Sequence, residues 1–470
     1  MLNFGLTSLM SRATQFLPTS VFALWAGDLA LIYASYLAAS YALVGDTLPV
    51  WLADEDGWLR ITIVVVSLVV AMYFLDFYED VQHQPGVLLV QQVCLVVGIA
   101  FLAQALLSYG RGLILFKWIM IWGSVGVIVV IPLWRWLFQT ALVASAGAES
   151  VLLLGSSPIA SSLAAALRER PYLGRKLIGY LAENSGAEQE MADVPRLGLI
   201  SDLKSVTEKT HPDRIVIGLS ARGDTLPVVD LIQLRFFGTP IDEIGAMYQE
   251  VFGRISLQEL RAVELVFAQK VGPSHVEARI QTIYSFVIAL ISLIVLSPAL
   301  LLVAILIKLD SRGPVFFRQV RVGLHEKEFT LYKFRSMRAD AEKHTGAVWA
   351  TLDDPRVTTL GKWLRRLRID EFPQFVNVLR GEMTLVGPRP ERPEFVSNLN
   401  EQIPYYRQRH YVKPGITGWA QINYKYGDTM EDTVTKLEYD LYYIKNFQIA
   451  LDLMIIFRTL KIMVRARGSQ

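Results

Sequence analysis

The chain has 470 residues, of which 52% are hydrophobic and 19% charged, and it contains a single cysteine, Cys94. This length allows about three domains. A charged fraction below the roughly 25% of soluble proteins argues against a purely cytosolic enzyme and against disorder, and one cysteine excludes an internal disulfide framework and a cysteine-rich metal site.

The net charge of +2 conceals three regions of different charge. Residues 1–145 carry 5 basic and 8 acidic residues, residues 146–269 carry 12 and 16, and residues 270–470 carry 29 and 20. We expect these regions to be three domains. The basic excess of the last one suits a unit that faces phosphate groups or an anionic membrane surface. A solvated basic face without a ligand is the alternative.

Residues 1–145 are expected to form a four-helix transmembrane domain. Tryptophans cluster at or near the ends of its apolar stretches, as interfacial aromatic residues do. The loop Gly45–Gly57 is acidic and lacks Lys and Arg, so we place it outside, and four spans then return the chain to the cytoplasm. The stretches long enough to span a bilayer are Leu17–Val44, Leu59–Phe77, Val87–Leu107 and Leu113–Phe138.

Residues 146–269 are expected to form a Rossmann-like α/β domain. Short apolar runs at Val151–Leu154, Leu177–Leu181 and Arg214–Leu219 alternate with helical patterns, which indicates a parallel sheet. Of the dinucleotide-binding glycines only Gly155 is present, and Ser157 and Ala160 occupy the other two positions. The pattern therefore favours a structural or regulatory module over an NAD-binding domain.

An apolar segment at residues 281–309 is interrupted by Ser297 and Pro298. A fifth full span with a tolerated kink is one interpretation. However, basic residues flank both ends, as is typical of cytoplasmic sides, and a full span would place the basic region outside. Proline removes a backbone hydrogen bond, and Ser297 can bond to the freed carbonyl. We expect a re-entrant membrane helix with its break at these two residues.

Several short motifs rich in charged residues, Gly and Pro follow this apolar segment. They include an acidic pair, Asp370-Glu371, three residues before Pro373, and Gly381 marks a natural helix end. We expect the pair at a helix N-terminus, where free N–H groups stabilise a carboxylate and a phosphate. The other motifs are Gly313–Gly323, Leu331–Met337, Asp353–Thr358, Gly361–Arg368, Leu385–Glu391 and Lys413–Gln421.

In order and spacing these motifs resemble the catalytic domain of bacterial polyprenol-phosphate phosphoglycosyl transferases. These are the sugar transferases that initiate exopolysaccharide or O-antigen assembly. The resemblance covers about residues 281–464, and the membrane and Rossmann-like regions match the large, multi-domain form of the family. It implies a monotopic catalytic domain on the cytoplasmic face of the bacterial inner membrane.

The resemblance further implies a double displacement. Asp370 would attack the sugar-bearing phosphoryl group of a UDP-sugar and expel UMP, and polyprenol phosphate, here undecaprenyl phosphate, would attack the phosphosugar–aspartyl intermediate. Glu371, with Asp370, would hold Mg²⁺. The residues that match the family's substrate-binding positions are Lys333, Arg335, Arg365, Arg389 and Lys425.

Two alternatives stay open. Asp353-Asp354 could be the metal motif of a conventional nucleotide-sugar glycosyltransferase that releases UDP, although Pro355 and Arg356 after it favour a turn. The chain could also be a membrane-tethered, nucleotide-sensing regulator. We expect no nucleic-acid partner and a possible homodimer through the middle domain.

The C-terminal stretch from Phe447 to Arg467 is apolar, with four basic side chains interspersed. This pattern predicts a helix. It is compatible with a helix that lies in the membrane interface and with one that packs in a core.

Overall fold

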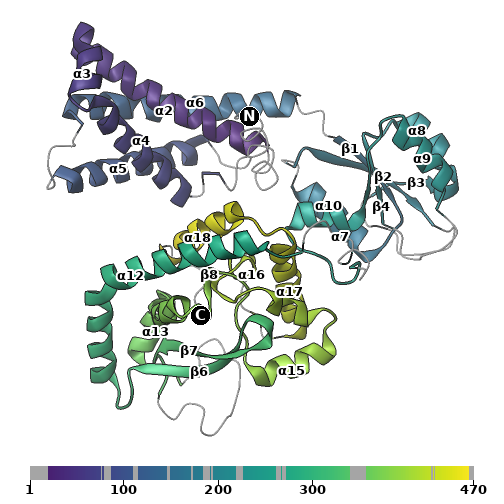
Figure 1. Cartoon of the computed structure of the whole chain (residues 1–470). Coiled ribbons are helices and arrows are strands. Elements are labelled where there is room, and N and C mark those ends of the chain that lie inside the picture. Colours follow the sequence, from purple (N-terminus) through teal and green to yellow (C-terminus); the bar gives the residue numbers. More distant parts are fainter. Residues whose placement is uncertain are drawn as a thin grey trace. The chain divides into compact units, whose positions relative to one another are not determined.

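The computed structural model describes residues 19–75, 77–78, 86–108, 115–145, 149–170, 173–183, 191, 194–218, 226–260, 266, 271–338, 356–424, 427 and 429–464. The chain divides into two compact units (Figure 1). The first comprises residues 1–156, 164–215 and 219–241, and the second comprises residues 157–163, 216–218 and 242–470. Each unit is described by itself.

The first unit begins with long apolar helices at the predicted spans: α2 (Thr19–Val44), α4 (Gly57–Phe74), α5 (Gly86–Ser108) and α6 (Lys117–Ser145). A short helix, α3 (Leu48–Asp54), lies between α2 and α4. The apolar segments of these helices at Ala23–Asp54, Gly57–Phe74, Leu89–Leu106 and Lys117–Phe138 are long enough to cross a bilayer. A fifth such helix, His275–Asp310, lies in the second unit.

Polar side chains join α2 to α6 inside this bundle. Arg135 of α6 pairs with Asp28 of α2 at 2.7 Å and donates a second hydrogen bond to the carbonyl of Phe77. Both charged side chains are buried. Because an unpaired charge in an apolar bundle is costly, the two helices are fixed in one register.

The middle region forms a five-stranded sheet with the order β3-β2-β1-β4-β5, and β1 pairs parallel with β2 and β2 with β3. The leucine and valine side chains of β1 are fully buried, as the apolar run predicts. The elements here are β1 (Glu149–Leu154), α7 (Pro158–Glu169), β2 (Arg175–Ala182), β3 (Arg196–Leu199), α8 (Leu203–Thr210), β4 (Arg214–Ile217), α9 (Val228–Phe236), β5 (Ile241–Glu243) and α10 (Ile244–Phe252). The region is thus a Rossmann-like parallel α/β fold.

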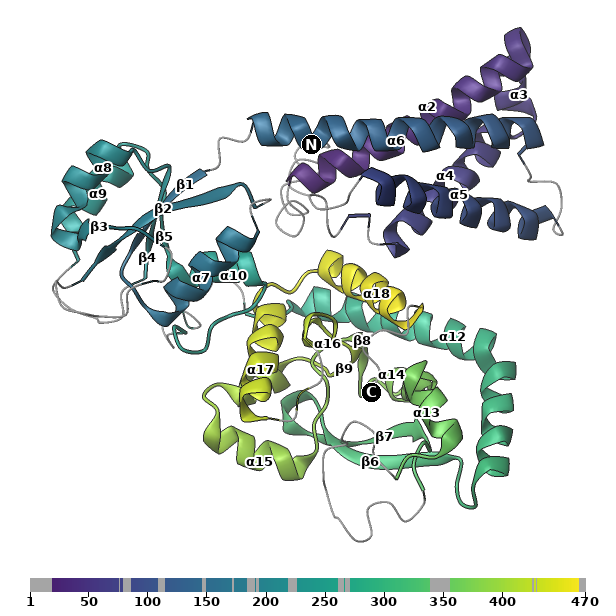
Figure 2. The ribbon, with the colours of Figure 1, turned by 180° about the vertical axis from the view of Figure 1, so that it is seen from behind.

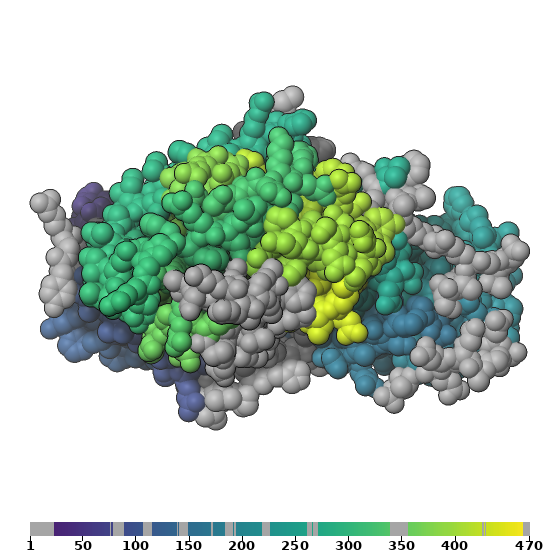
Figure 3. Space-filling model, turned by 90° about the horizontal axis from the view of Figure 1, so that it is seen from below, coloured from purple at the N-terminus to yellow at the C-terminus, as the bar shows by residue number. Residues whose placement is uncertain are grey.

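The remaining elements of the second unit surround an antiparallel hairpin, β6–β7, and a short parallel pair, β8–β9. They are α12 (His275–Asp310), β6 (Phe316–Val322), η4 (Leu324–Glu326), β7 (Glu328–Phe334), α13 (Thr359–Arg366), η5 (Ile369–Gln374), α14 (Phe375–Leu379), β8 (Thr384–Val386), α15 (Pro393–Gln402), η6 (Tyr406–Tyr411), β9 (Gly415–Thr417), α16 (Trp419–Asn423), α17 (Met430–Lys445) and α18 (Ile449–Val464). In the space-filling view, segments near residue 300 and near residue 400 form one continuous surface (Figure 3).

The helix α12 is bent sharply along its length (Figures 1 and 2). Pro298 lies inside it, and the Ser297 hydroxyl donates to the carbonyl of Ile294, four residues before the proline, at 2.8 Å. Since proline has no N–H for that carbonyl, the serine supplies the missing donor. Pro298 and Ser297, the two residues that interrupt the apolar segment in the sequence, therefore give a physical cause for the bend.

Both halves of α12 pack on the same unit. Ala289, in the first half, clusters with Leu331 of β7, and Ile307, near the end, clusters with Phe334 of the same strand. Eighteen residues of straight helix would separate two contacts by about 27 Å, whereas three residues of a strand span about 10 Å. The bend of α12 therefore accords with both halves belonging to clusters that include residues of one short strand.

Candidate active site: a buried acidic pair among arginines and a lysine

The acidic pair, Asp370 and Glu371, lies in the 3₁₀ turn η5, which leads into the short helix α14. The pair therefore lies at the start of a helical segment, as predicted, but its first turn is 3₁₀ and the α-helix itself covers only Phe375–Leu379. Arg368, in a left-handed conformation with φ of 54°, begins the turn, and Pro373 lies inside it. Both acidic residues are buried in this turn, at 7% and 8% exposure.

Glu371 is surrounded by three cations. Its carboxylate lies 3.0 Å from Arg389, 3.3 Å from Lys333 and 3.7 Å from Arg368. Burial alone would raise the pKa of Glu371, but the charges of these neighbours outweigh burial and hold the pKa below its usual range. The lowered pKa favours the charged form of Glu371 at neutral pH, where it pairs with the basic side chains around it.

Asp370 has a different environment. Among the described residues it has no ion-pair partner within 4 Å. Burial, and then the negative charge of Glu371, raise the pKa of Asp370, while Lys333 and other nearby cations partly counteract them. Two adjacent carboxyl groups are thereby driven to different proton affinities, a pattern that is typical of sites in which carboxylates have different roles.

Burial in this cluster also affects Lys333, which lies on β7 opposite Phe317 of β6. Desolvation lowers the pKa of Lys333, and Glu371 counteracts part of that effect. Asn377 of α14 fixes the strand next to η5, since it accepts from the N–H of Tyr332 and donates to the carbonyl of Thr330. The lysine is therefore held at the acidic pair by the hairpin.

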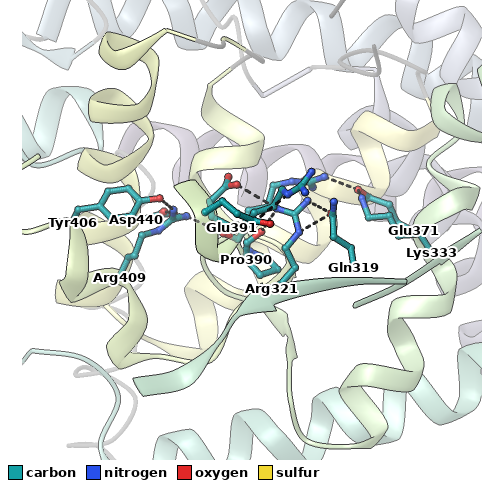
Figure 4. A network of polar contacts seen from close by, with 12 residues as sticks. Gln319, Arg321, Lys333, Glu371, Pro390, Glu391, Tyr406, Arg409 and Asp440 are labelled. Carbon is teal, nitrogen blue, oxygen red and sulfur yellow. Dashed lines mark hydrogen bonds and ion pairs between the residues drawn. The ribbon is translucent and has the colours of Figure 1, made fainter. Parts of the chain in front are cut away.

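Arg389 reaches Glu371 from a tight turn that follows β8. Gly387 precedes it, and a Cβ atom there would lie 2.4 Å from the carbonyl oxygen of Lys413, so no larger residue fits. Arg321 of β6 donates to the carbonyl of Pro390, at 3.1 Å, and to the carboxylate of Glu391. Figure 4 shows this network between the hairpin and the turn.

A buried polar cluster holds the other side of the same turn. Gln281 of α12 donates to the carbonyl of Val386, at 3.1 Å, and Tyr443 of α17 bonds to the same oxygen at 3.3 Å. Both also bond to Asp452 of α18, as does Tyr284 of α12. Burial raises the pKa of Asp452 to about 6. The cluster joins the membrane helix α12 to the strand that precedes Arg389.

The structure brings Lys333, Arg389 and the acidic pair together, but it places other predicted residues elsewhere. Arg365 donates to the hydroxyl of Ser336, and its charge acts on Asp370. Arg335 bonds to the carbonyls of Ile307, Ser311 and Arg312 at the end of α12, so its guanidinium anchors that helix. Lys425 and the Asp353-Asp354 pair lie outside the described residues.

The sequence motifs contained some contributors whose role was not assigned. Arg368 and Arg321 lie in quoted motifs, and only their contacts show that they pair with Glu371 and Glu391. Arg409 and Asp440 form a buried ion pair behind Arg389, and no motif pointed to Asp440. Within the described residues, no three His, Cys, Asp or Glu side chains form a group that could hold a metal ion by themselves.

Two family models match different parts of the chain. Residues 276–466 match the family model described as bacterial sugar transferase, and residues 73–232 match a model described as a CoA-binding domain. The first match contains the acidic pair and every basic residue of this site.

Relatives in several bacteria share this region. A UDP-N-acetylgalactosamine-undecaprenyl-phosphate N-acetylgalactosaminephosphotransferase of Aeromonas hydrophila is 43% identical over 231 residues, 49% of this chain and 54% of that protein. An undecaprenyl-phosphate glucose phosphotransferase of Komagataeibacter xylinus is 34% identical over 68% of this chain and 60% of that protein. The chain therefore spans only part of the length of these two relatives.

A third relative is matched over more of its length. It is a UDP-glucose:undecaprenyl-phosphate glucose-1-phosphate transferase of Xanthomonas campestris pv. campestris, 32% identical over 354 residues. The alignment covers 73% of this chain and 72% of that protein, so it includes sequence well before the region of the acidic pair.

Proposed function

The chain belongs to the bacterial sugar transferase family, and on this premise we propose that it transfers a hexose-1-phosphate from a UDP-sugar to undecaprenyl phosphate and releases UMP. The printed activities of the three relatives support this proposal, since each transfers a sugar phosphate to undecaprenyl phosphate. The product would be the first lipid-linked sugar of an exopolysaccharide or O-antigen.

One observation carries the proposal: two adjacent buried carboxylates have different partners. Glu371 has three cationic partners within 4 Å, whereas Asp370 has none within that distance among the described residues. A nucleophile needs an unshared oxygen with raised basicity, and burial provides it. Asp370 is therefore the nucleophile in our proposal, and Glu371 organises Lys333 and Arg389.

The proposed chemistry has two displacements at one phosphorus atom. An Asp370 carboxylate oxygen attacks the sugar-bearing phosphorus, and the bond from that phosphorus to the bridging oxygen breaks, so UMP leaves with that oxygen. An oxygen of undecaprenyl phosphate then attacks the same phosphorus and frees the carboxylate. Lys333 and Arg389, together with Arg365, whose charge acts on Asp370, would stabilise the charge on the phosphoryl oxygens.

The acidic pair also fits Mg²⁺. This cation is commonly bound by one or two carboxylates together with substrate phosphates, so a site with two protein carboxylates matches its preference. Asp370 and Glu371 would hold it, and it would neutralise diphosphate charge. Arg335 is left out of the phosphate-binding set because its guanidinium is engaged at α12, whereas Lys425 stays in the set as a proposal.

The membrane arrangement completes the proposal. Four helices of the first unit would span the inner membrane, and α12 would enter and leave on the cytoplasmic side. Support for the re-entrant path comes from its bend at Pro298 and from the anchoring of both halves to one unit. The acidic pair would then lie where a lipid phosphate and a soluble UDP-sugar meet.

The proposal is tested by the nucleotide that leaves. Purified full-length protein is incubated with undecaprenyl phosphate, Mg²⁺ and a panel of UDP-sugars, and nucleotides are separated by chromatography. We expect UMP and a lipid diphosphate sugar in equal amounts with at least one sugar. Release of UDP would instead support a conventional glycosyltransferase, and no nucleotide release with any sugar would contradict the proposal.

The proposed re-entrant path of α12 can be tested separately by thiol labelling. In a Cys94→Ser background, Val276→Cys and Arg312→Cys place one thiol at each exposed end of α12, and Glu55→Cys places one in the acidic loop between α3 and α4. A membrane-impermeant maleimide should label both α12 thiols in inverted vesicles and Glu55→Cys in right-side-out vesicles. A straight span would give the two α12 thiols opposite patterns.

A further inference from the structure

A buried ion pair lies directly behind the turn that carries Arg389. Arg409 of η6 and Asp440 of α17 pair at 2.8 Å, and their side chains are only 7% and 3% exposed. The guanidinium of Arg409 also donates to the Tyr406 hydroxyl, at 2.6 Å, and lies over the ring of that tyrosine. These contacts leave Arg409 little rotational freedom.

The same guanidinium reaches the active-site turn. Its Nη2 atom donates to the backbone carbonyl of Arg389 at 2.9 Å, while the side chain of Arg389 lies 3.0 Å from Glu371 on the other side. Figure 4 shows the sequence of contacts from Tyr406 and Asp440, through Arg409 and the turn, to Glu371 and Lys333. One residue therefore separates the buried pair from the acidic pair.

A buried ion pair of this kind is poor evidence for stability alone. Removing two charges from water costs free energy that their attraction rarely repays, and apolar residues of similar volume often stabilise such a position as well or better. Desolvation by complete burial accordingly raises the pKa of Asp440 to about 6, although Arg409 opposes that effect. A role beyond packing is therefore needed to explain the pair.

We propose that Arg409, held by Asp440, is a positioning residue that fixes the backbone at Arg389 so that its guanidinium faces Glu371 and the substrate phosphates. The inference rests on the proposed function of that site. Arg321, which bonds to the next carbonyl at Pro390, holds the turn from the hairpin side. Misplacing a catalytic group by about 1 Å can cost about 100-fold in rate, so this contact should matter although it touches no substrate.

The test is a double-mutant cycle on UMP release. Asp440→Asn keeps the side-chain shape, removes the charge that holds Arg409, and should lower kcat/KM by about 10- to 100-fold. If the pair acts through Arg389, adding Asp440→Asn to Arg389→Ala should cause little further loss, because the contact to be positioned is already absent. If the two effects multiply, the pair has only a structural role and the inference is overturned.

A control on the same helix separates positioning from stability. Asp432 belongs to the capping box at the start of α17 and contacts Thr429 and Tyr424. Asp432→Asn weakens this helix start without touching Arg409, so any loss that it causes should multiply with that of Arg389→Ala. The inference is supported if Asp440→Asn, but not Asp432→Asn, is coupled to Arg389→Ala in the double-mutant cycle. Equal coupling of both aspartate variants to Arg389→Ala contradicts it.

A milder variant covers the case in which Asp440→Asn does not fold. Tyr406→Phe keeps the ring and removes only the hydroxyl bonded to Arg409. It should lower kcat/KM by a few-fold, again without further loss in the Arg389→Ala background. Wild-type protein that releases no UMP would overturn the proposed function itself, whereas UMP release with multiplicative effects would overturn this inference alone.

Discussion

Replacing Asp370 with asparagine should reduce UMP release by at least about a thousandfold, because the amide is not a nucleophile and loss of such a group typically costs 10³- to 10⁶-fold. The protein should not lose stability. The folded state raises the pKa of Asp370, so the charged form at neutral pH is less favourable in the fold than in the unfolded chain. A neutral asparagine removes that cost, and thermal unfolding should show an unchanged or higher Tm.

The matched control is Asp354→Asn, which changes the other acidic pair by the same chemistry. It should retain most of the activity if Asp353-Asp354 forms a turn. Full turnover by Asp370→Asn would contradict the assignment of the nucleophile. Loss of activity only in Asp354→Asn would support the glycosyltransferase alternative. Both variants are compared by UMP release and by Tm in the same detergent.

Replacing the neighbouring Glu371 with glutamine should have the opposite effect on stability. The folded state lowers the pKa of Glu371, so its charged form contributes stability at neutral pH that is lost as the pH falls through the folded pKa. Glutamine would leave Lys333, Arg368 and Arg389 without their common anion. Breaking a buried ion pair in this way costs about 3–5 kcal/mol, so Tm should fall by several degrees.

Activity of Glu371→Gln should fall by about 100- to 1,000-fold, since Lys333 and Arg389 lose the anion that orients them and the proposed Mg²⁺ site would lose a ligand. Higher Mg²⁺ concentrations should recover part of this loss if the metal contact is real. We would measure UMP release at increasing Mg²⁺ concentrations and Tm on the same variant. These two measurements separate the loss of a metal ligand from the loss of side-chain orientation. A variant with full activity or with raised Tm would contradict the role assigned to Glu371.

The sequence predicted the parts of the fold that depend on regular patterns. The apolar stretches of residues 1–145 correspond to α2, α4, α5 and α6, and the short apolar runs of the middle region correspond to β1, β2 and β4. Such patterns reflect burial along a whole element, so they can be read without knowledge of tertiary contacts. Element ends differed by a few residues, as is typical when caps are weak.

The candidate site was less predictable. The acidic pair and the basic residues were identified from motifs, but whether a given arginine faces the pair or a helix end depends on contacts between distant segments. Arg335 lies two residues after Lys333, yet Lys333 reaches Glu371 and Arg335 reaches the end of α12. Asp440 pairs with Arg409 across 31 positions, and no local pattern marks such a partner.

Hydrogen bonds near both ends of α12 join this helix to the strands next to the acidic pair. Gln281 ties the first half of this helix to the strand before Arg389, and Arg335, which follows β7, ties its last turn to the strand that carries Lys333. Hydrogen bonds thus join α12 to the two strands that flank the acidic pair. If α12 enters and leaves one leaflet as proposed, the depth of its bend in the lipid would set the distance of Asp370 from the membrane surface.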